Sequence, residues 1–344
     1  KDPKYFGINL NKPEYPKFNF VKSFKKVLGF SGVLTLISLL AILVLGVKLG
    51  QDFTGGTLME FKFDKEVSKQ ELQTKLVEIQ EELKEEGIVS GGPLAAKAVE
   101  EKITIDFKNA SLTQASTGAF MLKSKYMDSA THDKVVAELE EEFGNLNEQK
   151  FTTVGATIGN AFKEKALIAI LIASLGIIIY VAFAFRKVPK ELNPWRFGIT
   201  AIIAVIHDLF ITMGFFVILG AIFNVEIDAL FITAMLTVLG YSVNDTIVVF
   251  DRTRENAKLA SKDEKIEDIV NKSLNQTLWR SLNTVSTTLV ALIVIFIGTF
   301  FGAESIRYFI LALIFGIGIG AYSSIFVATA GLVIWKQWSD KRSK

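Results

Sequence analysis

Six apolar runs, each long enough to cross a lipid bilayer as a helix, limit what this chain can fold into. A bilayer core requires about 20 consecutive apolar residues in a helix. Half of the 344 residues are hydrophobic, and the mean hydropathy is +0.37. We therefore predict a polytopic α-helical membrane protein with six transmembrane helices, at approximately residues 27–47, 164–185, 197–219, 227–250, 276–301 and 306–335.

Lysine and arginine in the short loops predict how the helices are oriented. Loops on the cytoplasmic side of a membrane carry an excess of these residues. The segment 1–26, the loop "RKVPKELNPWR" and the tail 336–344 are basic, whereas "GAIFNVEID" and "GTFFGAES" contain neither residue. We expect both termini in the cytoplasm and the segment 48–163 on the opposite side. Residues 1–26 also lack the pattern of a removable signal peptide.

The segment 48–163 is a long hydrophilic insert between the first two spans and is predicted to fold as an α/β domain. Between Gln51 and Asn160 it contains 12 Lys or Arg and 20 Asp or Glu. The order β-α-β-β-α-β predicts a ferredoxin-like sandwich. We expect a partly helical insertion loop at Asn109–Ala130. The predicted helices are "SKQELQTKLVEIQEELKEEG", which begins with a Ser68–Glu71 capping box, and "THDKVVAELEEEFG"; the predicted strands are "TLMEFKF", a strand near Ile88, "KITIDFK" and "KFTTVG".

The composition argues against several classes of function. The chain has no cysteine, which excludes disulfides and thiol catalysis. It lacks the GxxxxGK[ST] phosphate-binding loop of many nucleotide hydrolases. The formal net charge of +2 gives no signal for nucleic-acid binding. We expect no enzymatic activity, no cofactor, no metal site and no nucleic-acid partner.

Ionisable side chains inside the apolar runs are the candidates for function, because such groups usually face a bundle interior or a water-filled path. Asp245 lies about one and a half helical turns from Asp251 at the cytoplasmic end of the fourth span. Arg280 begins the fifth span, which is antiparallel to the fourth, so an Asp245–Arg280 pair is expected. His207 and Asp208 lie nearer the membrane centre.

Polar groups beside these residues extend the candidate site. Asn244 adds a hydrogen-bonding group next to Asp245. Polar residues follow one another at helical spacing along the fifth span and give it a hydroxyl-rich face. They are Arg280, Asn283 or Thr284, Thr287 and Thr288. Such a face can carry water between protonatable groups. If the Asp245–Arg280 distance varies between states, the carboxylate can bind and release a proton.

Structural interpretations stand beside each functional one. Asp245 and Arg280 can form an ion pair that only fixes helix register. Asp208 can lie in a watery vestibule, with His207 as a packing residue. The threonines can make ordinary hydrogen bonds between helices. The "FGIGIG" segment, residues 315–320, is expected to let the sixth span pack closely and is assigned no chemistry.

Five segments of the chain resemble signatures of one family of membrane proteins. The chain is similar to the SecF family, which belongs to the RND-like superfamily, over about residues 20–335. Ala156 stands where the family usually has proline, and the insert aligns less well. The segments are "GYSVNDTIVVFDRTREN" in the fourth span, "GQDFTGGTLMEF" after the first, "TVGATIGNAF" before the second, "IHDLFITMG" in the third and "SLNQTLWRSLNTVSTTL" in the fifth.

The resemblance implies a role in protein export. SecF proteins pair with SecD, act beside the SecYEG channel, and help to release exported unfolded polypeptides by using a proton or sodium gradient. YajC is a further implied partner, and the implied location is a bacterial or archaeal cytoplasmic membrane. Asp245 and Arg280 match the family's fourth-span Asp and fifth-span Arg, which belong to its ion-coupling machinery. Asp208 matches the third-span Asp.

Two other functions remain open from the sequence. Six spans with one outer insert could form half of an RND-type small-molecule exporter. Such exporters normally carry a second outer insert, whereas the loop between the fifth and sixth spans here is short. The chain could also be a scaffold that braces a translocon without transporting anything.

Overall fold

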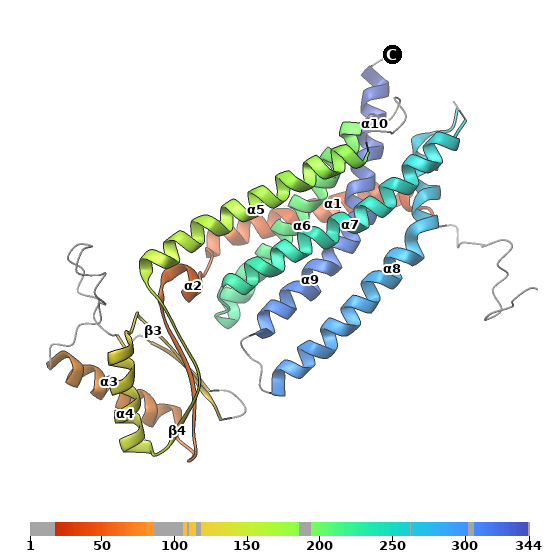
Figure 1. The fold of residues 1–344 in the computed structure, drawn as a ribbon. Helices are drawn as coiled ribbons and strands as arrows, with labels where there is room; N and C mark the ends of the chain where they lie inside the picture. Colours follow the sequence, from red (N-terminus) through yellow and green to blue (C-terminus); the bar gives the residue numbers. More distant parts are fainter. Residues whose placement is uncertain are drawn as a thin grey trace, which may run out of the picture.

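The computed structural model describes residues 18–85, 106–108, 110–114, 118–185, 194–261, 263–301 and 306–342. In this part of the chain, long helices form a bundle, and a smaller α/β domain is attached at one end (Figure 1). Six segments are long and apolar enough to cross a membrane, as predicted: Phe20–Leu45, Thr157–Val181, Trp195–Phe223, Ala229–Leu259, Ile266–Phe301 and Arg307–Arg342. The helices that form them are α1 (Phe20–Leu45), α5 (Ala156–Ala184), α6 (Pro194–Phe223), α7 (Ala229–Leu259), α8 (Ile266–Gly298) with η3 (Thr299–Phe301), and α9 (Arg307–Ser323) with η5 (Ser324–Ala328) and α10 (Thr329–Arg342).

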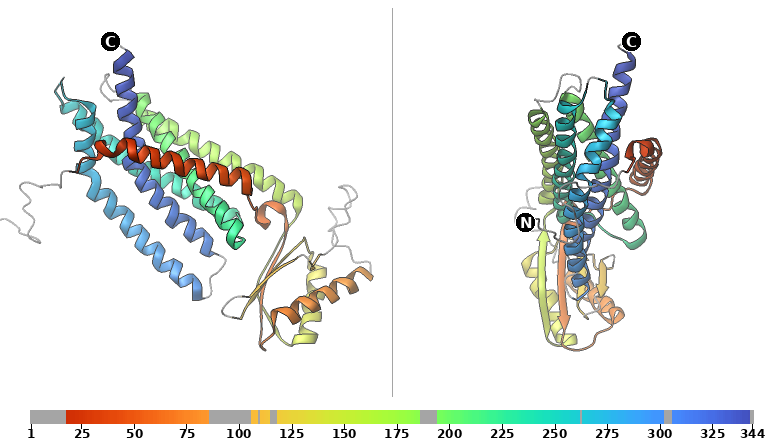
Figure 2. Two further views of the ribbon diagram at one scale, coloured as in Figure 1. Left: turned by 180° about the vertical axis from the view of Figure 1, so that it is seen from behind. Right: turned by 90° about the vertical axis from the view of Figure 1, so that its right-hand side faces the viewer.

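The centre of the bundle consists of α6, α7 and the last span. About half of the most apolar window of each is buried, whereas α1, α5 and α8 are mostly exposed. Figure 2 shows α1 lying along the face of α6 when the molecule is seen from behind. Large apolar side chains on the outer faces, such as Leu171 and Val294, suit contact with lipid or with a partner helix.

Glycines bring α9 close to α7, which confirms the packing predicted for "FGIGIG". A Cβ atom at Gly316 would overlap the side chain of Val238. A Cβ at Gly320 would lie 3.0 Å from Cβ of Ser242. By contrast, a Cβ at Gly318 would meet nothing within 4 Å. Small residues in transmembrane helices let backbones approach in this way.

The α/β domain contains a four-stranded antiparallel sheet with the order β2-β3-β1-β4. The helices α3 and α4 cover one face of it (Figure 1). Apolar side chains from the sheet and both helices, including Phe61, Leu72 and Leu139, form one core. The predicted capping box is confirmed, because Ser68 N donates to Glu71 Oε2 at 3.1 Å and Glu71 N donates to Ser68 Oγ at 3.2 Å. The elements are β1 (Gly56–Phe63), α3 (Lys69–Glu85), β2 (Ser111–Gln114), β3 (Phe120–Ser124), α4 (Ser129–Phe143) and β4 (Leu146–Val154).

The expectation of an insertion loop at Asn109–Ala130 was wrong, because this stretch contains β2 and β3. Leu112, Phe120 and Leu122 are buried in the domain core, and Leu112 pairs with Leu122 across the two strands. The small polar residues between the strands conceal this alternation in the sequence. In the predicted strand "KITIDFK", the described residues Asp106–Lys108 are not in a strand. The rest of that strand and the strand near Ile88 lie outside the described residues.

The helical hairpin of α7 and α8 continues past the apolar runs. α7 extends through Asp251 to Leu259, and α8 begins at Ile266. Asn256 closes this hairpin, since its Nδ2 donates to Ser273 Oγ and to Gln276 Oε1, each at 2.8 Å. The two helices are therefore joined by polar contacts beyond the end of each hydrophobic segment.

Candidate functional site

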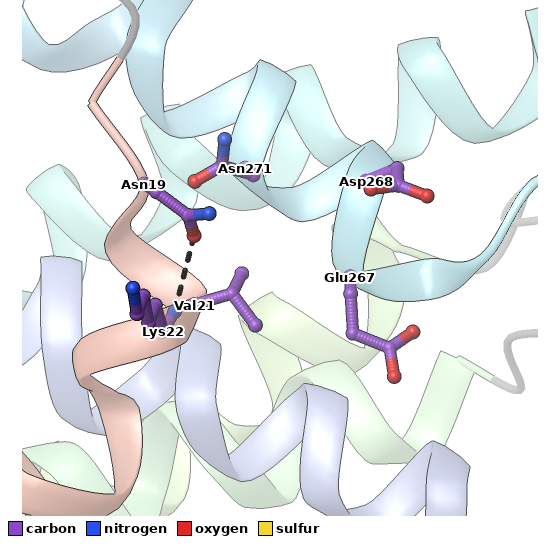
Figure 3. Close-up of a pocket in the computed structure, with 6 residues that line it drawn as sticks. All are labelled: Asn19, Val21, Lys22, Glu267, Asp268 and Asn271. Carbon is purple, nitrogen blue, oxygen red and sulfur yellow. Dashed lines mark hydrogen bonds between the residues drawn. The ribbon is translucent and has the colours of Figure 1, made fainter.

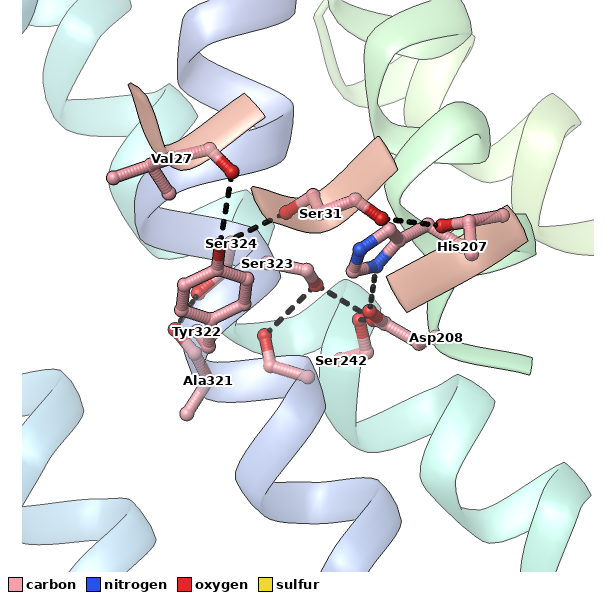
Figure 4. A network of polar contacts seen from close by, with 11 residues as sticks. Val27, Ser31, His207, Asp208, Ser242, Ala321, Tyr322, Ser323 and Ser324 are labelled. Atoms are coloured by element: carbon pink, nitrogen blue, oxygen red, sulfur yellow. Dashed lines mark hydrogen bonds and ion pairs between the residues drawn. The ribbon is translucent and has the colours of Figure 1, made fainter. Parts of the chain in front are cut away.

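A cluster of polar side chains lies at the centre of the bundle, where α6, α7 and the last span meet (Figure 4). Asp208 is its most buried charged residue, with 1% of its surface exposed. Asp208 Oδ2 accepts hydrogen bonds from Ser242 Oγ at 2.6 Å and from Ser323 Oγ at 2.7 Å. Its Oδ1 lies 2.9 Å from His207 Nδ1. Hydroxyl groups and an imidazole thus surround this carboxylate, and no arginine or lysine pairs with it among the described residues.

Asp245, the second carboxylate of the cluster, is 7% exposed and bonds to Ser324, which follows Ser323 on the last span. Ser324 Oγ donates to Asp245 Oδ2. Ser323 and Ser324 are consecutive, at the junction of α9 with the π-helix η5. Successive helical residues point about 100° apart, so these two side chains can reach different helices. π-helical turns within α-helices often occur at functional sites.

The expected Asp245–Arg280 ion pair is not formed in this structure. Arg280 is exposed, and within the described residues no carboxylate lies within ion-pair distance of its guanidinium. Near Arg280, the buried residues of α8 are Thr277, Ser281 and Val285. Arg280 precedes Ser281, so its side chain leaves the helix about 100° away from this buried stripe. The prediction that Arg280 begins the fifth span was wrong, because α8 begins at Ile266 and Arg280 lies near its middle; the rotation of the helix could not be read from the sequence either.

The predicted hydroxyl line on α8 is only partly joined to the rest of the bundle. Thr288 Oγ1 lies 3.0 Å from Tyr241 Oη on α7, but Thr287 Oγ1 donates to its own helix, to the carbonyl of Asn283 at 3.0 Å. Asn244 is exposed on α7. Neither Asn244 nor Thr287 therefore reaches the carboxylates, and the contact of Thr288 fits the interpretation as a hydrogen bond between helices.

His207 lies in the cluster with one ring nitrogen unsatisfied. The residue is 7% exposed, and its buried Nε2 atom has no hydrogen-bond partner in the part of the chain that the structure describes. Its ring stacks on Tyr322, with 6.4 Å between the centroids. Tyr322 Oη in turn lies 2.8 Å from Ser31 Oγ on α1. Sequence reasoning missed Ser31, Ser242, Tyr322, Ser323 and Ser324; the only available signal was the polar run "YSS" inside an apolar span.

The α/β domain is joined to the start of α7 by a set of hydrogen bonds that we call the latch, formed by residues 48–52 and 226–229 with Lys123. Gly50 N donates to the Ile227 carbonyl at 2.7 Å, and Ile227 N donates to the Lys48 carbonyl at 2.8 Å. Asp52 Oδ2 accepts a hydrogen bond from Ala229 N at 2.9 Å. Because Ala229 is the first residue of α7, the carboxylate also lies where a helix dipole favours negative charge.

Charged groups at the latch reinforce this connection. Lys123 Nζ on β3 lies 2.8 Å from Glu226 Oε2 in the α6–α7 loop. Asp228 caps α7, since its Oδ1 accepts a hydrogen bond from Phe231 N at 2.8 Å. Burial raises the pKa of the Asp228 carboxyl, and the nearby Asp52 carboxylate raises it further, whereas the Phe231 N–H opposes the shift. The described residues contain no group of three or more His, Cys, Asp or Glu side chains that could hold a metal ion.

Glycines allow the close approach of backbones beside the latch, in the segments "DFTGG" and "TVGATIG". Gly56 has φ +138°, and a Cβ there would lie 2.7 Å from the Ser124 carbonyl oxygen. A Cβ at Gly159 on α5 would lie 2.9 Å from Gly55 N. The start of α5 therefore rests directly on the short helix α2 (Gln51–Thr54).

A separate polar pocket of about 270 Å³ lies between the starts of α1 and α8, away from the α/β domain (Figure 3). Phe20 N donates to Asn271 Oδ1 at 2.9 Å beside it. This bond holds the start of α1 against α8. The pocket is lined by Asn19, Val21, Lys22, Glu267, Asp268 and Asn271.

Two family models match the chain. The model for the protein export membrane protein SecD/SecF, C-terminal, matches residues 134–338, and the model for the SecD/SecF GG motif matches residues 40–67. The protein translocase subunit SecF of Thermobaculum terrenum is 42% identical over 299 residues, which cover 86% of each chain. That of Anaerolinea thermophila is 34% identical over 321 residues, which cover 92% of this chain and 94% of its own.

Solved structures of SecDF share this architecture. The crystal structure of SecDF from Thermus thermophilus, described as a translocon-associated membrane protein, matches with a TM-score of 0.72 and 31% identity over 94% of this chain. A second SecDF structure, in a super-membrane-facing form, matches with a TM-score of 0.63 and 30% identity. This chain spans 39% and 40% of the lengths of those two proteins.

Proposed function

The chain belongs to the SecD/SecF family of protein-export membrane proteins, and on that basis we propose that it is an auxiliary SecF-type subunit of the Sec protein translocase. In this role it couples a proton or sodium gradient to the late-stage export of unfolded polypeptides across the cytoplasmic membrane of a bacterium or archaeon. The proposed partners are SecD, the SecYEG channel and YajC. The greater length of the matching SecDF chains supports SecD as the partner that supplies the remaining part.

One observation carries the coupling proposal: the latch joins the α/β domain to the helix that bears Asp245. Asp52 and Gly50 hydrogen-bond to Ala229 and Ile227, at and just before the start of α7. A shift of α7 would therefore pull on residues 48–52 and on β1 beyond them. Moving one elementary charge across 100 mV supplies about 2.3 kcal/mol, which is enough to change the balance between two orientations that differ by a few kcal/mol.

Asp245 is the proposed ion switch, with Arg280 as a partner in only one state. In this structure the carboxylate bonds to Ser324 and the guanidinium is exposed. In the alternative state, Arg280 would approach and stabilise the ionised carboxylate, which would release its proton. Asp208 belongs to the same proposed machinery. Asn244, Thr287 and Thr288 do not contact the carboxylates in this structure, so their proposed contribution is indirect, through water on the hydroxyl-rich face of α8.

The proposed topology follows the sequence. The α/β domain, residues 48–163, lies outside the cytoplasm, and its strand order with one helix after β1 and one after β3 supports a ferredoxin-like fold. The basic segments 1–26 and 336–344 both lie in the cytoplasm. Between them, the chain crosses the membrane once at 27–47 and five times within 164–335. The relatives are named translocase subunits, which supports a transport role and not a catalytic one.

The decisive test is Asp245→Asn in vesicles reconstituted with SecD, SecYEG and this chain. We expect the complex to assemble normally and to lose the stimulation of export by an imposed gradient. Asp251→Asn is the matched control, because Asp251 lies on the same helix but is exposed and pairs with Arg254 at 2.6 Å. Gradient stimulation that survives Asp245→Asn would reject ion coupling and favour the scaffold function.

A further inference from the structure

His207 and Asp208 have the arrangement of a proton-binding pair separate from Asp245. In the neutral imidazole, one nitrogen carries a hydrogen and the other a lone pair. Nδ1 lies 2.9 Å from Asp208 Oδ1, so this side of the ring is engaged. Nε2 is buried and has no hydrogen-bond partner among the described residues. With Nδ1–H donating to the Asp208 carboxylate, the lone pair lies on Nε2, where no donor among the described residues occupies it.

We propose that His207 and Asp208 form a second proton-binding site, in which a proton adds to the lone pair of His207 Nε2. The imidazole then becomes an imidazolium, whose charge is balanced by the Asp208 carboxylate beside Nδ1. No covalent bond other than N–H forms or breaks. This inference rests on the proposed gradient-coupled function, and it adds a second ion-binding step to the one at Asp245.

The surroundings of the pair contain few competing charges. The groups recorded around it are Ser242 on α7, Ser323 and Tyr322 on the last span, and Ser31 on α1 through its bond to Tyr322. Of these, only the phenol of Tyr322 is titratable. The two hydroxyl donors to Asp208 Oδ2 stabilise an ionised carboxylate, which can then accept the charge of a protonated His207.

The two proton-binding sites are connected through adjacent backbone positions. Ser323 donates to Asp208 and Ser324 donates to Asp245. A change in the charge of Asp245 changes its bond to Ser324, and any adjustment of η5 that follows also moves the donor to Asp208. Coupling between two binding sites is reciprocal, so protonation of Asp245 changes the proton affinity of His207 and the reverse also holds.

The chain has only two histidines, which makes a direct test practical. The complex with SecD is prepared with ¹⁵N-labelled histidine rings, and a His132→Gln variant leaves His207 as the only labelled residue of this subunit. His132 lies on α4 of the α/β domain, so this change does not touch the bundle. We expect the ring nitrogens to move between the neutral and imidazolium positions as pH falls. Signals that stay in one state from about pH 5 to pH 8, the range of an ordinary histidine, would overturn the proposal.

Two further variants test the connection and the identity of the ion. Asp245→Asn is expected to shift the midpoint of the His207 titration, and an unchanged midpoint would refute the coupling. A titration that disappears when potassium is replaced by sodium would show that Na⁺ occupies Asp208, which would overturn the assignment to protons. His207→Gln is expected to lower gradient-stimulated export several-fold, and unchanged export would also contradict the proposal.

These readouts separate the second site from the function on which it rests. If His207 titrates but export does not respond to a gradient, the site is real and the coupling function fails. If export responds to a gradient but His207 does not titrate, the second site fails and the function stands.

Discussion

The carboxylate of Asp245 is held by the hydroxyl of Ser324 and not by the guanidinium of Arg280. This relationship separates the two residues that the sequence suggested as a pair. The π-helix η5 begins at Ser324 and therefore supplies the hydrogen-bond donor to Asp245. A buried carboxylate that exchanges a hydroxyl partner for a guanidinium partner has two distinct states, which is the minimum that an ion-driven switch requires.

Ser324→Ala tests the importance of this bond. We expect the variant to lose about 1–3 kcal/mol of stability, because Asp245 Oδ2 loses its hydrogen-bond donor while it stays buried. Thermal unfolding in detergent measures this loss, and gradient-stimulated export should fall with it. Ser286→Ala is the control, since Ser286 is exposed on α8. Equal behaviour of the two variants would show that the bond to Ser324 has no special role.

Gly316→Ala tests the close contact between α7 and α9. The added Cβ would overlap Val238, so the two helices must separate or shift. Overpacking of this kind typically costs about 1–3 kcal/mol. Gly318→Ala provides a matched comparison two residues away, where the added Cβ meets nothing within 4 Å. We expect a lower midpoint of thermal unfolding for Gly316→Ala alone, and a similar loss for both would contradict the packing described for this face.

Asp52→Ala tests whether the latch transmits movement. The variant removes the acceptor for Ala229 N, an N-terminal helix contact worth about 0.5–2 kcal/mol. We expect faster amide hydrogen exchange at residues 48–52 and 227–231, with little change in the domain core around Leu72. Export should lose its response to the gradient although Asp245 is intact. Asp133→Ala, at an exposed carboxylate on α4, should leave both exchange and export unchanged.

The raised pKa of Asp228 predicts how stability at the latch depends on pH. A carboxyl whose folded-state pKa lies above its ordinary value of 3.8 binds its proton more tightly in the folded protein. The stability that follows from this tighter binding is fully present below pH 3.8 and is lost as pH rises through the folded-state pKa. Asp228→Asn keeps Oδ1 as an acceptor for Phe231 N and removes the titration. The difference between wild type and variant in the midpoint of thermal unfolding should therefore change across this pH window, whereas a constant difference would show that Asp228 titrates normally.

Several features of the fold could be predicted from short stretches of the chain. Six apolar runs indicate six helices because their length matches the thickness of a bilayer. Ser68 and Glu71 indicate a helix start because their bonds span only three residues. The burial of Asp208 and Asp245 follows from the cost of a charge in lipid. The strands β2 and β3 were not predicted because each is short. The alternation of buried and exposed side chains along them can be recognised only from their pairing, in which Leu112 faces Leu122.

The sequence by itself thus determined which segments cross the membrane and which polar side chains must be shielded there. The tertiary structure decided which of these side chains meet. The rotation of α8 directs Arg280 away from the bundle, and the contact at Gly320 brings Ser242 and Ser323 together around Asp208. The physical reason is the distance in sequence over which each effect acts. Hydropathy and helix capping act within a few helical turns. The partner of a buried carboxylate depends instead on how neighbouring helices rotate and approach, and packing between segments distant in sequence sets this.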